Sequence, residues 1–119
     1  MGKEIRTDFI LSAIQDGLWE IDFHSNTYCF SDLNFTMLGF EPIQDKAGYD
    51  FLLGKMHPDD RVILENETAL IVSGFASSWV FTIRFQSAAG AWQYILSRGR
   101  CIERDEQGIG YKLAGTHTD

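Results

Sequence analysis

The last third of the chain restricts its fold most, because it reads as three successive strands with no helix between them. Apolar and polar side chains alternate over residues 79–85, and a second strand-like run covers residues 92–102. Ala89-Gly90 provides a turn between these two, and the turn-rich residues 105–108 precede a third strand over residues 111–118. Strands joined by short turns pair in antiparallel fashion. The sequence therefore predicts an antiparallel sheet.

The first third of the chain adds a helix and a hairpin. Residues 4–16 carry apolar side chains every three or four positions, which is the spacing of an amphipathic helix. Residues 18–23 alternate between apolar and acidic side chains, which is typical of a half-buried strand. The turn residues at 24–26 lead to a return strand over residues 27–30. The face of the first strand that we expect to be buried consists of Trp19, Ile21 and Phe23.

Three helices are predicted for the middle of the chain. Ser31 is a suitable N-cap for a short helix, and residues 47–53 form a second helical piece that Gly54 is expected to end. Pro58 fits the first position of a longer helix over residues 58–72. Because strands and helices are grouped along the chain and do not alternate, the pattern indicates an α+β fold.

Length and charge limit the classes of protein to which this chain can belong. The 119 residues suit one domain, which we place at residues 17–119 behind a flanking helix at residues 1–16. The net charge of −7 argues against a nucleic-acid partner and against direct contact with an anionic membrane. No apolar run approaches the roughly 20 residues that a membrane-spanning helix needs. The N-terminus has no signal-peptide pattern, so we expect a cytoplasmic location.

The residues with reactive or metal-binding side chains form no obvious site. Cys29 and Cys101 have no partner at metal-ligand spacing, and both fall among apolar neighbours of predicted strands, where cysteine behaves as a small buried hydrophobe. His57 precedes a predicted helix, and no second histidine or carboxylate cluster at ligand spacing supports a metal there. Asp59 and Asp60 are adjacent on that helix and so point in different directions. The sequence contains no phosphate-binding loop and no nucleophile motif, so we predict neither a metal site nor an enzyme.

Five short strings occur in the order and spacing of the motifs of PAS domains from bacterial sensor proteins. They are residues 17–22, residues 30–31 with 37–40, residues 57–61, residues 85–90 with Trp92, and residues 115–119. The His-Pro-Asp-Asp-Arg string at 57–61 and the terminal Gly-Thr-His-Thr-Asp string are the closest matches. The resemblance implies that His57 is a structural helix-entry residue. One departure is Ala89, which replaces the usual aspartate of the hairpin turn, although Gly90 keeps the flexible position. The chain thus resembles a PAS domain over residues 17–119.

The resemblance implies a five-stranded antiparallel sheet with short helices across one face and a ligand pocket between them. By position, the walls of that pocket would include Trp19, Ile21, Phe35, Leu38, Phe51, Leu52, Met56, Phe81, Ile83, Ile95 and Leu113. The alternative is that these side chains fill the core at normal density, and on that basis we expect no cofactor. Binding of a small-molecule ligand is the alternative expectation. His117 lies in the last predicted strand, where its alternation with Gly115 leaves either face of the sheet possible, and heme ligation by it is disfavoured. Flavin photochemistry is disfavoured because the family's flavin-reactive Asn-Cys-Arg-Phe string is absent.

The resemblance also implies a role in signalling. The domain would sense a signal within a histidine kinase or a cyclic-dinucleotide-synthesising (GGDEF) protein, and the output domain would follow Asp119. We expect a homodimer, built through the N-terminal helix, with intramolecular cover of the sheet as the alternative role of that helix. Two alternative functions are a dimerisation module without ligand and a small α+β enzyme with a cone-shaped cavity. The enzyme would need inward-facing pairs of aspartate and histidine.

Overall fold

The computed structural model describes residues 15–119, which form a five-stranded antiparallel sheet and three helices. The elements are β1 (Gly17–Asp22), β2 (Thr27–Phe30), α2 (Leu33–Thr36), α3 (Asp45–Lys55), α4 (Pro58–Ser73), β3 (Ser78–Gln86), β4 (Trp92–Arg104) and β5 (Gly110–Thr118). Their order across the sheet is β2-β1-β5-β4-β3, so β1 and β5 are neighbours. The predicted α+β class and antiparallel sheet are confirmed. The predicted flanking helix over residues 1–16 falls almost entirely outside the described residues.

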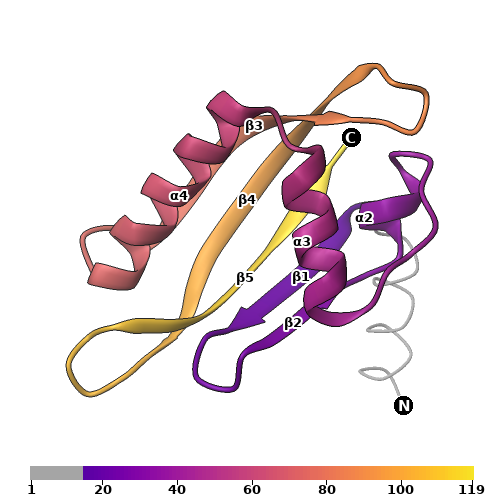
Figure 1. Cartoon of the computed structure of the whole chain (residues 1–119). Coiled ribbons are helices and arrows are strands. Elements are labelled where there is room, and N and C mark those ends of the chain that lie inside the picture. Colours follow the sequence, from indigo (N-terminus) through magenta and orange to yellow (C-terminus); the bar gives the residue numbers. More distant parts are fainter. Residues whose placement is uncertain (1–14) are drawn as a thin grey trace, which may run out of the picture.

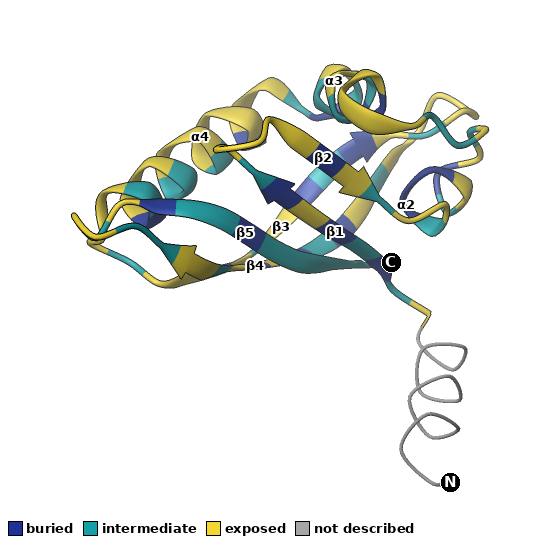
Figure 2. Cartoon of the chain, turned by 90° about the horizontal axis from the view of Figure 1, so that it is seen from below, coloured by how far each residue is buried: buried dark blue, intermediate teal, exposed yellow. Residues whose placement is uncertain are grey.

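The helices lie on one face of the sheet. In Figure 1, α4 runs over β3 and β4, while α3 lies near β1 and β2. Figure 2 shows both helices on the same side of the strands. Alternate strand residues point toward the helices and are buried, as Ile21, Ile83, Ile95 and Leu113 illustrate. The core therefore lies between the sheet and the helices, and no described element covers the opposite face.

Two tryptophans and two glycines form a row across this inner face. Trp19 in β1 faces Gly115 in β5, and Trp79 in β3 faces Gly99 in β4. The two glycines also face each other, so the row is continuous. The indoles stack with their centroids 5.6 Å apart and their planes at 14°. A Cβ atom on Gly99 would overlap the Trp79 indole, and one on Gly115 would overlap the Arg98 carbonyl oxygen. Both positions therefore require glycine.

This row leads to a prediction about stability. Gly99→Ala should lower the free energy of unfolding by about 2 kcal/mol, because the Trp79 indole must leave its place. Gly54→Ala should raise it by about 0.5–1 kcal/mol, because Gly54 lies inside α3 and an added Cβ meets nothing within 4 Å. Urea unfolding of both variants tests this. Similar effects of the two substitutions would contradict the tight packing at Gly99.

Two helix boundaries differ from the prediction. The N-cap of α2 is Asp32 and not Ser31. The Ser31 hydroxyl instead accepts a hydrogen bond from the backbone N–H of Leu18 at 2.8 Å, and so joins this segment to β1. Gly54 does not end α3, which continues to Lys55; the helix stops at Met56, whose extended backbone forms a bridge to β3. Tertiary contacts decide both boundaries.

Two side chains predicted to be buried are exposed. Strand β1 ends one residue before Phe23, which is 40% exposed. Cys29 is exposed because it faces Glu20 on the uncovered side of the sheet. Its neighbours Tyr28 and Phe30 point toward the helices, and side chains alternate along a strand. The apolar neighbours of Cys29 in the sequence therefore did not indicate its burial.

Candidate functional site

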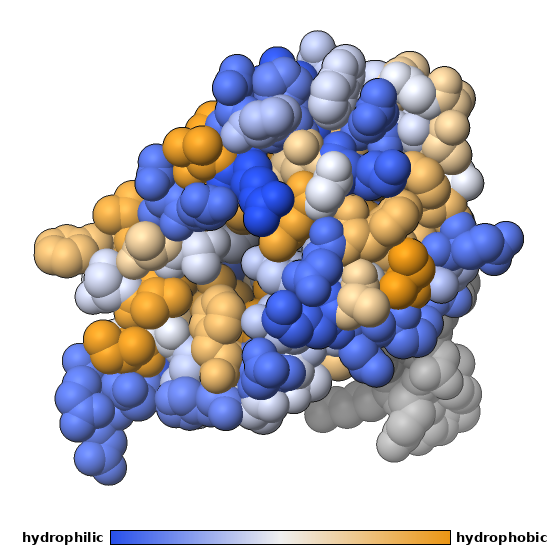
Figure 3. All heavy atoms as spheres, viewed as in Figure 1, coloured by the Kyte–Doolittle hydropathy of each residue, from blue (hydrophilic) through white to orange (hydrophobic). Residues whose placement is uncertain are grey.

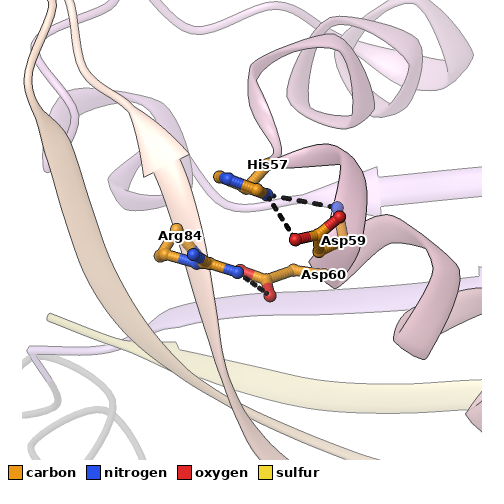
Figure 4. A network of polar contacts seen from close by, with 4 residues as sticks. All are labelled: His57, Asp59, Asp60 and Arg84. Atoms are coloured by element: carbon orange, nitrogen blue, oxygen red, sulfur yellow. Dashed lines mark hydrogen bonds and ion pairs between the residues drawn. The ribbon is translucent and has the colours of Figure 1, made fainter.

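The His-Pro-Asp-Asp-Arg string forms the corner between α3 and α4 (Figure 4). The Nδ1 atom of His57 accepts a hydrogen bond from the backbone N–H of Asp59 at 3.1 Å, and so caps α4. The backbone N–H of His57 donates to the carbonyl oxygen of Arg84 in β3 at 2.8 Å. Pro58 occupies the start of α4, where its missing N–H costs nothing. The predicted helix-entry role of His57 is confirmed.

Asp60 fixes this corner to the sheet. The residue is only 4% exposed, and its carboxylate accepts three hydrogen bonds from Arg84. The donors are the backbone N–H at 2.7 Å, Nε at 2.9 Å and Nη2 at 2.8 Å. These bonds hold the pKa of Asp60 below its ordinary value and raise the pKa of Arg84. Asp59 has a largely exposed side chain, so the two carboxylates do not form one site, as predicted.

A cavity of about 50 Å³ lies between the sheet and the helices α3 and α4. Six residues of the predicted pocket wall line it: Trp19, Ile21, Leu52, Met56, Ile83 and Leu113. Its lining also includes Phe23, Tyr49, Thr68, Trp79, Ser97 and His117. The space-filling view shows apolar side chains among polar ones on this helix-bearing side of the molecule (Figure 3). The volume corresponds to a few water molecules, and is about a third of the ~150 Å³ that holds benzene in an engineered cavity.

The other five predicted wall residues lie outside the cavity lining. They are Phe35, Leu38, Phe51, Phe81 and Ile95. Phe35, Leu38 and Ile95 are buried in one continuous apolar cluster, and Phe51 and Phe81 pack against it. All of these side chains belong to the core, but alternation along the sequence cannot show where packing leaves a gap. The predicted pocket thus combines part of a cavity wall with part of the solid core.

Polar side chains at one end of the cavity form a continuous hydrogen-bonded chain. Trp79 Nε1 donates to Ser97 Oγ at 3.1 Å. Ser97 Oγ lies 3.2 Å from His117 Nε2, and His117 Nδ1 lies 3.0 Å from Asn34 Oδ1. The chain runs from β3 through β4 and β5 to α2. The sequence left open which face His117 occupies; the structure places it on the inner face.

Burial lowers the pKa of His117 to about 4, so the imidazole is neutral at physiological pH. Serine, histidine and asparagine in this order resemble a nucleophile, a base and an orienting group. Ser97, however, has no exposed surface, and a base with so low a pKa is poorly matched to neutral pH. The partner of His117 is the amide of Asn34 and not a carboxylate. This hydrogen-bonded chain of side chains is therefore structural in this conformation.

The sequence interpretation missed Ser97 and Asn34. Ser97 has the same parity in its strand as Ile95, which gave a usable signal that it points inward. Asn34 gave no such signal, because asparagine in a four-residue helix next to a turn is ordinarily solvated. Its burial follows from contacts with strands that are distant in the sequence.

Metal-ligand clusters and membrane-spanning helices were sought among the described residues. Across residues 15–119, no group of three or more histidine, cysteine or acidic side chains is arranged to hold a metal. Cys101 is half-buried, and its thiol donates to the carbonyl oxygen of Glu103. None of the described helices has the length and apolar character to cross a bilayer.

The sheet order, the helices on one face and the cavity beneath them define an α+β domain of the type that the motifs indicate. The chain belongs to the PAS family: residues 30–117 match the family described as PAS fold. It is 32% identical over 103 residues to the sensor protein FixL of Bradyrhizobium diazoefficiens. That match covers 87% of this chain and 20% of FixL, so the chain spans about a fifth of that relative.

Solved structures share the fold. A sensory box histidine kinase/response regulator from Burkholderia thailandensis superposes with a TM-score of 0.73 at 20% identity, over 96% of this chain and 83% of that one. The N-terminal domain of a diguanylate cyclase with PAS/PAC sensor from Marinobacter aquaeolei gives 0.68 at 18% identity, over 87% and 94%. The chain thus has the PAS fold in common with domains of a histidine kinase and a diguanylate cyclase.

Proposed function

We propose that this chain is the signal-sensing module of a larger cytoplasmic signalling protein. A change in cavity occupancy or in dimer packing would pass from it to a C-terminal output domain, either a histidine kinase or a diguanylate cyclase. Catalysis would belong to that output domain. The observation that carries the proposal is the position of His117, which lines the cavity and lies in β5, two residues before Asp119.

A second contact supports a route from the helices to the end of β5. Gln93 Nε2 donates to the carbonyl oxygen of Met37 at 2.9 Å and to Asp119 Oδ2 at 3.0 Å. Met37 is the C-cap of α2, so movement of this helix would reach Asp119 through one side chain. A signal of this kind requires two states that the ligand or the partner stabilises to different extents.

The first test is a UV–visible spectrum of the purified protein, with mass spectrometry of any molecule released on denaturation. Sensing through the cavity predicts a stoichiometric small molecule, or saturable binding of one from a metabolite library. A heme or flavin band would require the cavity to expand well beyond 50 Å³. If no molecule co-purifies and no added molecule binds, the result would count against cavity sensing and favour the dimerisation module.

The dimerisation module has its own supporting observation. The uncovered face of the sheet exposes apolar side chains, among them Val80 (63%) and Tyr94 (65%). Exposed apolar side chains on an uncovered sheet face can mark an interaction site. The homodimer, with the N-terminal segment at its interface, is proposed to form here. Sedimentation equilibrium of wild type and of Val80→Glu should show a concentration-dependent dimer that the charge weakens; an unchanged equilibrium would place the interface elsewhere.

A further inference from the structure

Asn34 lies beside the start of β1 and the end of β5. Its Nδ2 atom donates to the carbonyl oxygen of Leu18 at 2.9 Å and to that of Ser31 at 3.0 Å. Its Oδ1 atom lies 3.0 Å from His117 Nδ1. Leu18 is the second residue of β1, and His117 is the second-last residue of β5. One buried side chain therefore contacts both β1, the first strand in the sequence, and β5, the last strand in the sequence.

The neighbours of His117 determine its tautomer. Both hydrogens of the Asn34 amide nitrogen are directed to carbonyl oxygens, so Asn34 Oδ1 can only accept and His117 Nδ1 must carry the hydrogen. His117 Nε2 then accepts, and the Ser97 hydroxyl donates to it. The Ser97 oxygen in turn accepts from Trp79 Nε1. Every hydrogen bond in the chain has one direction, and Asn34 and His117 use all their nitrogen atoms.

The packing at this junction leaves no room for a side chain at position 17. Gly17, the first residue of β1, is directly opposite His117. A Cβ atom on Gly17 would approach Asn34 Oδ1 to 2.6 Å, so the amide fills the space above this glycine. Asn34 is only 2% exposed. Fully satisfied buried polar networks of this kind favour a single arrangement over its competitors.

We propose that Asn34 and His117 form a polar latch that couples the segment before Gly17 to whatever follows Asp119. In the closed latch, the start of β1 and the end of β5 are held together through α2. Loss of the Asn34–His117 hydrogen bond would leave only the contacts of Gln93 between α2 and the end of β5. The end of β5 could then move relative to α2. This inference rests on the proposed relay through β5, but it requires no ligand in the cavity.

The first measurement is made on the wild-type protein. Long-range ¹H–¹⁵N correlation spectra of the imidazoles should show His117 as the neutral Nδ1–H tautomer at pH 7. This tautomer is the less usual one for a free imidazole in water, so the result is diagnostic. The Nε2–H tautomer, or rapid exchange between the two, would overturn the latch, because Asn34 Oδ1 would then face an unprotonated nitrogen.

The second experiment measures coupling by removing residues 1–14 in two backgrounds. With Asn34 in place, the truncation should shift the amide resonances of residues 116–118. In Asn34→Ala, the same truncation should shift them by less than half as much, and amide exchange at these residues should be at least tenfold faster. Asn66→Ala, an exposed asparagine in α4, is the matched control and should leave the coupling at its wild-type value.

The outcomes separate the latch from the wider proposal. Equal shifts in the Asn34→Ala and wild-type backgrounds would show that the backbone pairing of β1 with β5 carries the coupling, and would refute the latch. If Asn34→Ala does not fold, Asn34→Asp keeps an acceptor for His117 but loses both donors, and should preserve the His117 tautomer while reducing the coupling. Coupling through Asn34 in protein that binds no ligand would sustain the latch even where the ligand search has counted against cavity sensing, so failure of one proposal can be told from failure of the other.

Discussion

Replacing Asp60 with alanine is expected to lower the free energy of unfolding by about 3 kcal/mol, one of the two largest effects that the structure predicts. The carboxylate is buried and accepts three hydrogen bonds from Arg84, including one from its backbone N–H. Alanine would leave these donors without a partner, and hydrogen bonds to charged groups contribute about 1.5–3 kcal/mol. Water can reach the Arg84 guanidinium, which keeps the loss below that of a fully buried pair.

Asp59→Ala is the matched control, because it also removes an acidic residue from the first turn of α4. Its side chain is 80% exposed and is not bonded to β3. The substitution therefore removes only its interaction with the helix dipole and its 4.0 Å contact with His57 Nδ1, a loss of about 0.5 kcal/mol. Guanidinium unfolding of the two variants and of wild type measures the difference. If both variants lose the same small amount, the hydrogen bonds between Asp60 and Arg84 do not hold the corner to the sheet.

Lowering the pH from 7 to 4 is expected to remove up to about 3 kcal/mol of stability through His117 alone. Burial lowers the pKa of this imidazole to about 4 in the folded protein, whereas an unfolded chain has the ordinary value of about 6.5. Between these values the unfolded state binds more protons than the folded state, so stability falls as the pH is lowered. The loss begins near pH 6.5 and is complete below about pH 4.

His117→Gln tests this assignment, because glutamine does not titrate and retains hydrogen-bonding groups. We expect the variant to be less stable than wild type at pH 7, and its stability to change less between pH 6.5 and pH 4. Urea unfolding across this range gives both curves, and the difference between them isolates His117 from the carboxylates, which titrate in both proteins. Parallel curves would mean that His117 is protonated as easily in the folded state as in the unfolded state.

The sequence alone was sufficient for the strands and most of the helices. Alternation over residues 79–85 and the turns at residues 89–90 and 105–108 predicted the antiparallel strands, because these patterns depend on near neighbours in the chain. The motif at residues 57–61 indicated a structural role for His57, which the hydrogen bond to Asp59 confirms. Local geometry follows from local sequence, so these features could be read directly.

The tertiary structure alone decided the position of the cavity and the polar chain beside it. The sequence showed that Phe35 and Ile83 belong to the core, but only packing shows that Ile83 borders a gap and Phe35 does not. The sequence did not determine which face of the sheet His117 occupies, and it gave no reason to expect Asn34 to be buried. These two residues are 83 positions apart, and their contact exists because β1 and β5 pair with each other above α2. A pattern with a period of two or four residues carries no information about such a distant contact, which depends on the register of the whole sheet.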